Sequence, residues 1–269
     1  MKISEGIYFK NFKRKKVNIR LHRLLKDLTL NENQIIRSLT SSYQNSYSKS
    51  IILKLKKYSE IKLIGMGGST LGARAIYSFL KDKIKKKFIF VDSLEPKNNK
   101  IKKKKSFLNL IISKSGNTLE TITNTNILVK KNHKNIFITQ NQKSYLMTLA
   151  KKLKAEVIHH NDFIGGRYSV LSEVGMLPAE LMGLNQKKFK QFNDLIKNKN
   201  FINSLILNVS NIHEFIKKKR FNSIILNYDK NSYDLFSWYQ QLVAESLGKK
   251  GKGLLPVISN MPKDNHSLM

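Results

Sequence analysis

The chain has 269 residues, of which 50 are Lys or Arg and 18 are Asp or Glu, so its formal net charge is +32. A charge of this size suggests nucleic-acid binding, but only seven of the 50 basic residues are Arg, the side chain that reads phosphates and bases bidentately. We therefore interpret the charge mostly as Lys on solvated faces, and we expect no specific nucleic-acid partner.

The residue types exclude several kinds of chemistry. The sequence contains no Cys, so it has neither disulfides nor a thiolate nucleophile. No apolar run approaches the ~20 residues of a membrane span, so we expect a cytoplasmic protein without a membrane partner. The pair His159-His160 suggests a metal site, but neighbouring side chains on a strand point to opposite faces and no acidic or thiol partner is nearby. We expect no metal there.

Short apolar segments alternate with helical patterns from Glu60 onward, after a basic and polar segment of residues 1–48 that has a helical pattern around 31–39. The predicted strands are 61–65, 88–91, 108–113, 135–139 and 156–159, and the predicted helices are 71–80, 118–129 and 143–153. Strands separated by helices of roughly 10–15 residues are typical of parallel βαβ units. Residues 49–184 are therefore predicted to form a doubly wound parallel sheet of the α/β class, with helices on both faces.

A second unit is predicted to begin after Gly183. A helical tract over residues 186–219 leads into a strand at 223–227 and a helix at 233–246. Residues 185–269 are thus predicted to form a helical linker followed by the start of a second α/β domain.

The segment from Ser113 to Thr121 has the composition of a phosphate site. It stands where an apolar strand gives way to a helix, so the N–H groups of the helix N-terminus and its dipole favour an anion. The alternative is an ordinary Ser/Thr/Gly turn with a capped helix. The side chains expected to bind the anion are Ser113, Lys114, Ser115, Thr118 and Thr121.

Two further loops fall at predicted strand ends. In the first, Gly68 lets a ligand approach the backbone and Ser69 can donate from a helix cap. The alternative for this loop is the glycine-rich fingerprint of a dinucleotide-binding site. Position 70 is Thr where the fingerprint has its third Gly, whereas Asp92 could bind the ribose of such a cofactor. The second loop is Gly165-Gly166-Arg167, whose guanidinium can stabilise a developing oxyanion.

Taken together, these segments resemble the phosphoglucose isomerase family, whose members have paired sugar-isomerase (SIS) domains. The spacing between Glu245 and His266 is similar to that of the shorter, prokaryotic branch. The resemblance rests on these ordered segments: 64–69, 113–121, 164–172, 241–249, Lys252-Gly253 and 264–267.

The resemblance implies reversible conversion of glucose 6-phosphate to fructose 6-phosphate through a cis-enediol, without a metal or organic cofactor. Glu245 matches the family's base, His266 the residue that relays a proton during ring opening, and Arg167 the cation beside the enediolate. Gln241 matches a substrate-contacting side chain, and the Ser113–Thr121 segment with Gly68 and Ser69 matches the sugar-phosphate cradle. The family also implies a homodimer, in which the counterpart of His266 reaches the neighbouring subunit's site.

One departure from the family pattern bears on activity. The sequence ends three residues after His266, and a catalytic-site lysine near the family's C-terminus has no counterpart here. We therefore expect a C-terminally incomplete member with an incomplete second domain. The alternative function is a phosphosugar-binding regulatory module of the same fold, which is not expected to combine Arg167, Glu245 and His266.

Overall fold

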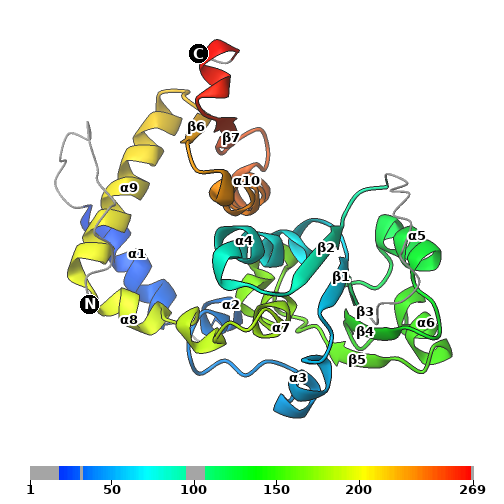
Figure 1. The fold of residues 1–269 in the computed structure, drawn as a ribbon. Coiled ribbons are helices and arrows are strands. Elements are labelled where there is room, and N and C mark those ends of the chain that lie inside the picture. The colour runs from blue at the N-terminus through cyan, green and yellow to red at the C-terminus, as the bar shows by residue number, and fades with distance from the viewer. Residues whose placement is uncertain (1–17, 31–32, 95–106, 268–269) are drawn as a thin grey trace.

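The structure, a computed structural model, describes residues 18–30, 33–94 and 107–267 and contains two parallel sheets (Figure 1). The larger sheet has five strands in the order β2-β1-β3-β4-β5, which confirms the predicted strands. Their bounds are β1 (Glu60–Ile64), β2 (Lys87–Val91), β3 (Phe107–Ile112), β4 (Lys134–Thr139) and β5 (Glu156–His159).

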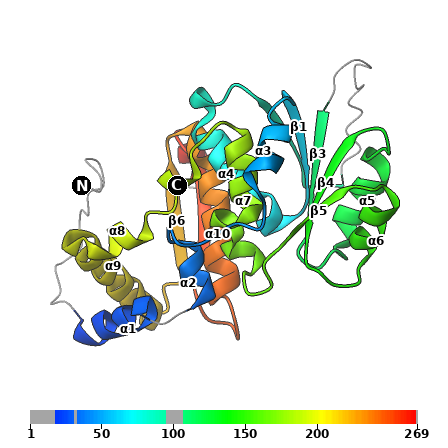
Figure 2. The same cartoon turned by 90° about the horizontal axis from the view of Figure 1, so that it is seen from below.

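Helices cover both faces of this sheet, which confirms the predicted α/β class (Figure 2). The apolar runs of the central strands are buried on both sides because alternate side chains pack against opposite helical layers. Leu63 and Leu110, for example, belong to one core, and Ile64 and Ile111 to the other. The first core is covered by α3 (Lys49–Leu55), α4 (Leu71–Phe79) and α7 (Glu173–Leu181), and the second by α5 (Leu119–Leu128) and α6 (Tyr145–Lys152).

The strand order places the predicted loops at the ligand-binding edge of the sheet. The chain winds from β1 to β2 in one direction and from β3 to β5 in the other, so the order reverses between β1 and β3. Open parallel sheets bind ligands at the carboxyl ends of such a pair of strands. The loops after β1 and β3 approach closely there, because a Cβ added to Gly65 would lie 2.8 Å from the Ile112 carbonyl oxygen.

The second sheet consists of β6 (Asn222–Asn227) and β7 (Leu255–Asn260), joined by α10 (Tyr233–Leu247). Because α10 also packs against α4, it connects the two sheets. The strand and helix predicted near 223–246 are confirmed. The strand β7 was not predicted, because Pro256 and the surrounding Lys and Gly residues obscured its pattern.

The helical tract predicted over residues 186–219 is not one helix. It consists of the 3₁₀-helix η4 (Gln186–Lys188), α8 (Phe192–Lys197) and α9 (Lys199–Lys217). The break occurs at Asn198, whose side-chain oxygen caps α9 by accepting a hydrogen bond of 3.0 Å from the Phe201 backbone N–H. None of the helices in the described ranges has the length and apolar character of a membrane span.

The N-terminal segment contains α1 (Ile19–Leu30) and α2 (Gln34–Ser38), and α1 packs against α9 (Figure 1). The helical pattern predicted around 31–39 corresponds to α2, while its first two residues lie outside the described residues. The helix α7 was not predicted, because Pro178 interrupts its pattern.

A buried lysine of the predicted linker binds the N-terminal segment, which in turn binds the first domain. Lys190 is 4% exposed, and its ammonium donates to the Tyr43 carbonyl oxygen (3.3 Å) and to Asn45 Oδ1 (3.2 Å). The Tyr43 hydroxyl in turn donates to Glu173 Oε2 at 2.9 Å. Burial lowers the pKa of Lys190 to about 8 and raises the pKa of Tyr43.

The lowered pKa of Lys190 predicts a pH dependence of stability. Between pH 8 and about 10 the unfolded chain holds this proton and the folded chain releases it, so stability should rise with pH. Above about pH 10 the raised pKa of Tyr43 reverses the trend, because only the unfolded state then loses the phenolic proton. Urea midpoints measured at several pH values should show the rise in the wild type and in the exposed control Lys188→Gln. The rise should be absent in Lys190→Gln, and an unchanged rise in that variant would contradict the assignment.

Candidate active site

The loop after β3 is held in one conformation by its own hydroxyl groups. Ser113 Oγ lies 2.9 Å from Thr118 Oγ1 and accepts a 3.2 Å hydrogen bond from the Gly116 backbone N–H. Gly116 has a φ of +66°, and a Cβ there would lie 2.3 Å from Ser144 Oγ. This turn therefore needs glycine, and the Ser113 hydroxyl organises the loop from inside.

The turn leads directly into the N-terminus of α5. Thr118 precedes the helix and makes no side-chain capping bond, so the first N–H groups of α5 are not occupied by their own cap. Ser115 is exposed beside them, and its Oγ accepts from the Asn117 backbone N–H at 3.2 Å. Thr121 Oγ1 is buried and, within the described part of the chain, lacks a hydrogen-bond partner. The arrangement can receive an anion.

The Lys114 ammonium is bound to a neighbouring loop in this structure. It donates a 2.7 Å hydrogen bond to the backbone carbonyl oxygen of Asp162, in the loop after β5. The side chain is thus tied to that neighbouring loop. A direct contact between Lys114 and an anion at α5 requires this bond to break.

The glycine loop after β1 touches the Gly-Gly-Arg loop through the backbone. A Cβ on Gly68 would lie 2.3 Å from the Gly166 carbonyl carbon and 2.7 Å from the Arg167 backbone nitrogen. Ser169 Oγ reinforces the contact by donating to the carbonyl oxygens of Gly166 (2.7 Å) and Gly68 (3.3 Å). Ser69 ends the 3₁₀-helix η1 (Gly67–Ser69) in the same loop. The two loops therefore form one rigid unit.

Arg167 and Glu245 meet at this junction. Arg167 Nη1 lies 2.9 Å from Glu245 Oε1, with the Arg side chain 19% exposed and the Glu side chain 50% exposed. Arg167 Nε also donates to Ser246 Oγ at 2.8 Å, and the guanidinium lies 4.5 Å from the centroid of the Tyr168 ring. The hydrogen bond from Ser246 lowers the pKa of Tyr168, and the charge of Arg167 acts in the same direction.

Gln241 lies on the same face of α10 as Glu245, because it precedes Glu245 by four residues. Its Nε2 would lie 2.9 Å from a Cβ on Gly67, which has a φ of +53°. Gln241 Oε1 is buried and has no hydrogen-bond partner among the described residues. A buried amide oxygen without a partner costs about 1–3 kcal/mol, so this atom is a natural acceptor for a ligand hydroxyl.

His266 is not brought to this junction within one chain. It is exposed at the end of the 3₁₀-helix η6 (Lys263–His266), which follows the carboxyl end of β7. Glu245 lies toward the opposite end of that strand, since Gln240, five residues before it on α10, donates to the Pro256 carbonyl oxygen near the start of β7 at 2.7 Å. The six residues of β7, with a rise of roughly 3.3 Å each, span about 17 Å, so His266 and Glu245 lie toward opposite ends of this strand.

Asp92 and His160, which belong to the two alternative readings, make contacts elsewhere. Asp92, considered for a ribose, forms a 2.7 Å ion pair with Arg74. His160 is buried, and its Nδ1 lies 3.1 Å from the Asn161 carbonyl oxygen. In the described ranges, no group of three or more His, Cys, Asp or Glu side chains is placed to hold a metal ion.

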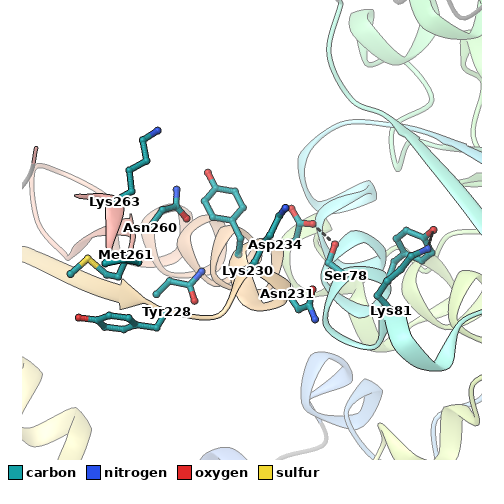
Figure 3. A pocket seen from close by; sticks show the side chains of 13 residues that line it. Ser78, Lys81, Tyr228, Lys230, Asn231, Asp234, Asn260, Met261 and Lys263 are labelled. Carbon is teal, nitrogen blue, oxygen red and sulfur yellow. Dashed lines mark hydrogen bonds between the residues drawn. The ribbon is translucent and has the colours of Figure 1, made fainter. Parts of the chain in front are cut away.

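A cavity of about 680 Å³ opens at the carboxyl ends of β6 and β7, apart from these residues (Figure 3). Its lining includes Asp234, in the first turn of α10, which accepts a hydrogen bond from Ser78. Eleven helical residues of ~1.5 Å each separate Asp234 from Glu245. None of the predicted site residues lines this cavity, so we do not assign the site to it.

Comparison with known proteins identifies the family. Residues 33–254 match the sequence model of phosphoglucose isomerase. The chain belongs to the phosphoglucose isomerase family. Glucose-6-phosphate isomerase of Methanocaldococcus jannaschii is 33% identical over 236 residues, which are 80% of this chain and 57% of that protein. The enzyme of Acholeplasma laidlawii is 33% identical over 243 residues, 79% of this chain and 56% of its own length. The chain thus spans about half the length of the curated relatives it matches.

Solved structures share the fold. A hypothetical protein of Thermus thermophilus superposes with a TM-score of 0.72 at 21% identity, covering 93% of this chain and 67% of that one. The tagatose-6-phosphate ketose/aldose isomerase of Escherichia coli gives a TM-score of 0.51 at 14% identity, covering 93% and 64%. At these identities the likeness concerns the fold, which is that of sugar-isomerase domains.

Sequence reasoning missed two side chains at the junction, Tyr168 and Ser246. Each directly follows a predicted site residue, and both lie in the segments that carry the likeness to phosphoglucose isomerases. Their position next to predicted site residues is the one feature of the sequence that indicates a role for them. Their contact joins residues 78 apart in the sequence, which no local pattern reveals.

The contact between the glycine loops predicts a sharp difference between two alanine substitutions. Gly68→Ala places a methyl group 2.3 Å from backbone that cannot yield, so it should destabilise the fold by about 1–3 kcal/mol. Gly165→Ala is the matched control, because its new Cβ would come no closer than 3.5 Å to a neighbour, the Tyr168 ring, and its φ of −67° suits alanine. Urea denaturation of both variants checks this, and equal stability would contradict the close approach.

Proposed function

We propose that this protein interconverts glucose 6-phosphate and fructose 6-phosphate through a cis-enediol, as a cytoplasmic enzyme. The observation that carries the proposal is the meeting of Arg167 and Glu245, 2.9 Å apart, at the glycine loop after β1. Membership of the phosphoglucose isomerase family supports it. A carboxylate base and a cation in contact with each other suit proton transfer next to a carbonyl group.

In the proposed mechanism the phosphate binds at the N-terminus of α5, near Ser115 and Thr118. His266 relays a proton between the ring oxygen and the anomeric hydroxyl, which opens the sugar ring. Glu245 then removes the proton from C2, and the electron pair moves toward the C1 carbonyl to give an enediolate. Glu245 returns the proton to C1 after the hydroxyl proton has moved from O2 to O1, which yields the ketose.

In this mechanism Glu245 has to move and Arg167 has to stay in place, and the exposed fractions of their side chains agree with these roles. Half of the Glu245 side chain is exposed, so its ion pair with Arg167 contributes only about 0–1 kcal/mol and a substrate can displace it. Arg167 is less exposed and keeps its bond to Ser246 when the carboxylate turns away. A movable base thus works beside a fixed cation, which stabilises the negative charge on the enediolate.

We further propose that the active site is completed by a second copy of the chain. His266 and Glu245 lie at opposite ends of β7, so they do not meet within one chain. A homodimer that presents exposed His266 to the partner's Arg167–Glu245 junction resolves this separation. The dimer is then a requirement of the chemistry, because ring opening and proton transfer need both side chains on one sugar.

The substitution Glu245→Gln tests the base. It keeps the size and hydrogen-bonding capacity of the side chain but removes the proton acceptor, so turnover of glucose 6-phosphate should fall about 10²-fold or more with little loss of binding. A coupled assay for fructose 6-phosphate and a calorimetric titration measure the two effects. The control is Glu156→Gln, whose carboxylate forms only a surface pair with Lys134 at 3.5 Å.

Two results would contradict the proposal. Wild-type turnover in Glu245→Gln would require a different base. Binding of glucose 6-phosphate by the wild-type protein without any turnover would instead favour the phosphosugar-binding regulatory module.

Mixing two inactive variants tests the shared site. Heterodimers of Glu245→Gln with His266→Ala contain one site with both residues intact if the site combines two subunits, and none if each chain supplies its own pair. We therefore expect co-expression to recover a substantial fraction of turnover, while each variant alone stays inactive. Persistent inactivity of the mixture, with mixed dimers verified by mass spectrometry, would place both residues in one chain.

A further inference from the structure

Ser246 connects the two side chains of the Gly-Gly-Arg loop that face α10. Its Oγ accepts a 2.8 Å hydrogen bond from Arg167 Nε and lies 2.9 Å from the Tyr168 hydroxyl. The Arg167 guanidinium also lies over the Tyr168 ring, with Cζ 4.5 Å from the ring centroid. Each of these three side chains therefore contacts the other two.

Two nitrogens of the Arg167 guanidinium are bound by α10. Nε is bound to Ser246 and Nη1 to Glu245, two consecutive residues in the last turn of that helix. These two bonds together fix the plane of the guanidinium group.

The bond to Ser246 is the one that can persist during a reaction. A guanidinium held only by Glu245 would lose its orientation when that carboxylate turns toward a substrate. The Nε bond to Ser246 and the stacking on Tyr168 do not involve the moving carboxylate. They also complete the support that begins in the backbone, where Gly68 fixes the position of the Arg167 main chain.

We propose that Ser246, supported by Tyr168, is a positioning residue that holds the Arg167 guanidinium against the oxyanion of the enediolate. The inference rests on the proposed isomerisation for its catalytic meaning, whereas the hydrogen bond itself can be measured without turnover. A cation displaced by about 1 Å loses much of its effect on a transition state, which can lower the rate up to ~10²-fold. Substrate binding depends mainly on the phosphate cradle and should change little.

The kinetic test uses the full-length protein and variants that change one atom group each. Ser246→Ala should lower kcat about tenfold with KM within about twofold, because only orientation in the transition state is lost. Ser246→Thr keeps the Oγ and should recover most of the rate. Tyr168→Phe keeps the ring below the guanidinium and should have a smaller effect than Ser246→Ala. The matched control is Ser237→Ala on the same helix, where the half-buried Ser237 donates a 3.1 Å hydrogen bond to the Tyr233 carbonyl oxygen.

A second readout does not depend on activity. The ¹⁵N–¹H resonance of Arg167 Nε, assigned by its loss in Arg167→Lys, should show faster hydrogen exchange in Ser246→Ala and stay unchanged in Ser237→Ala. An unchanged Arg167 resonance in Ser246→Ala, or kcat equal to that of the control, would overturn the inference. Absence of turnover in the wild type would overturn the proposed function instead, and a shifted Arg167 resonance would then still support the positioning contact.

Discussion

The close approach of Gly68 to the Gly166–Arg167 backbone is the constraint on which the candidate site depends. With no side chain at position 68, the loop after β1 and the loop before α7 share one surface, and the Cβ that any other residue would add lies 2.3 Å from Gly166. This contact sets the direction in which Arg167 leaves the backbone. The helix α10 then supplies Glu245 at the point where the guanidinium arrives, so two segments 78 residues apart meet with one geometry.

The helix α10 connects the two sheets and contributes Gln241 and Glu245 to the candidate site. Its first turn follows β6, its Gln240 side chain contacts the start of β7, and its outer face packs on α4 of the first domain. The same helix therefore packs against the strands of one unit and lies at the ligand-binding edge of the other. This dual packing explains why Gln241 and Glu245 lie over the glycine loop although the second sheet contributes no strand to that edge.

Local patterns predicted much of the first domain and much less of the second. The five strands and the turn after β3 could be predicted because buried parallel strands are continuous apolar runs, and because glycine and hydroxyl residues mark the turns between them. The strand β7 escaped prediction because Pro256 and its flanking residues lack that pattern, and α7 because Pro178 lies inside it. The roles of Tyr168 and Ser246, and the separation of His266 from Glu245, arise from tertiary packing that spacing along the chain does not encode.

Unpaired buried polar atoms mark the site only in combination with its geometry. Such atoms occur at Asn109, His133 and His159 as well as at Thr121 and Gln241, so the lack of a partner does not by itself indicate a ligand. Thr121 lies in the first turn of α5, and Gln241 lies against Gly67, where no side chain intervenes. Each unmet hydrogen bond costs about 1–3 kcal/mol in the free protein. Under the proposed function, a sugar phosphate that satisfies both atoms would remove this cost, and the removal would add to its affinity.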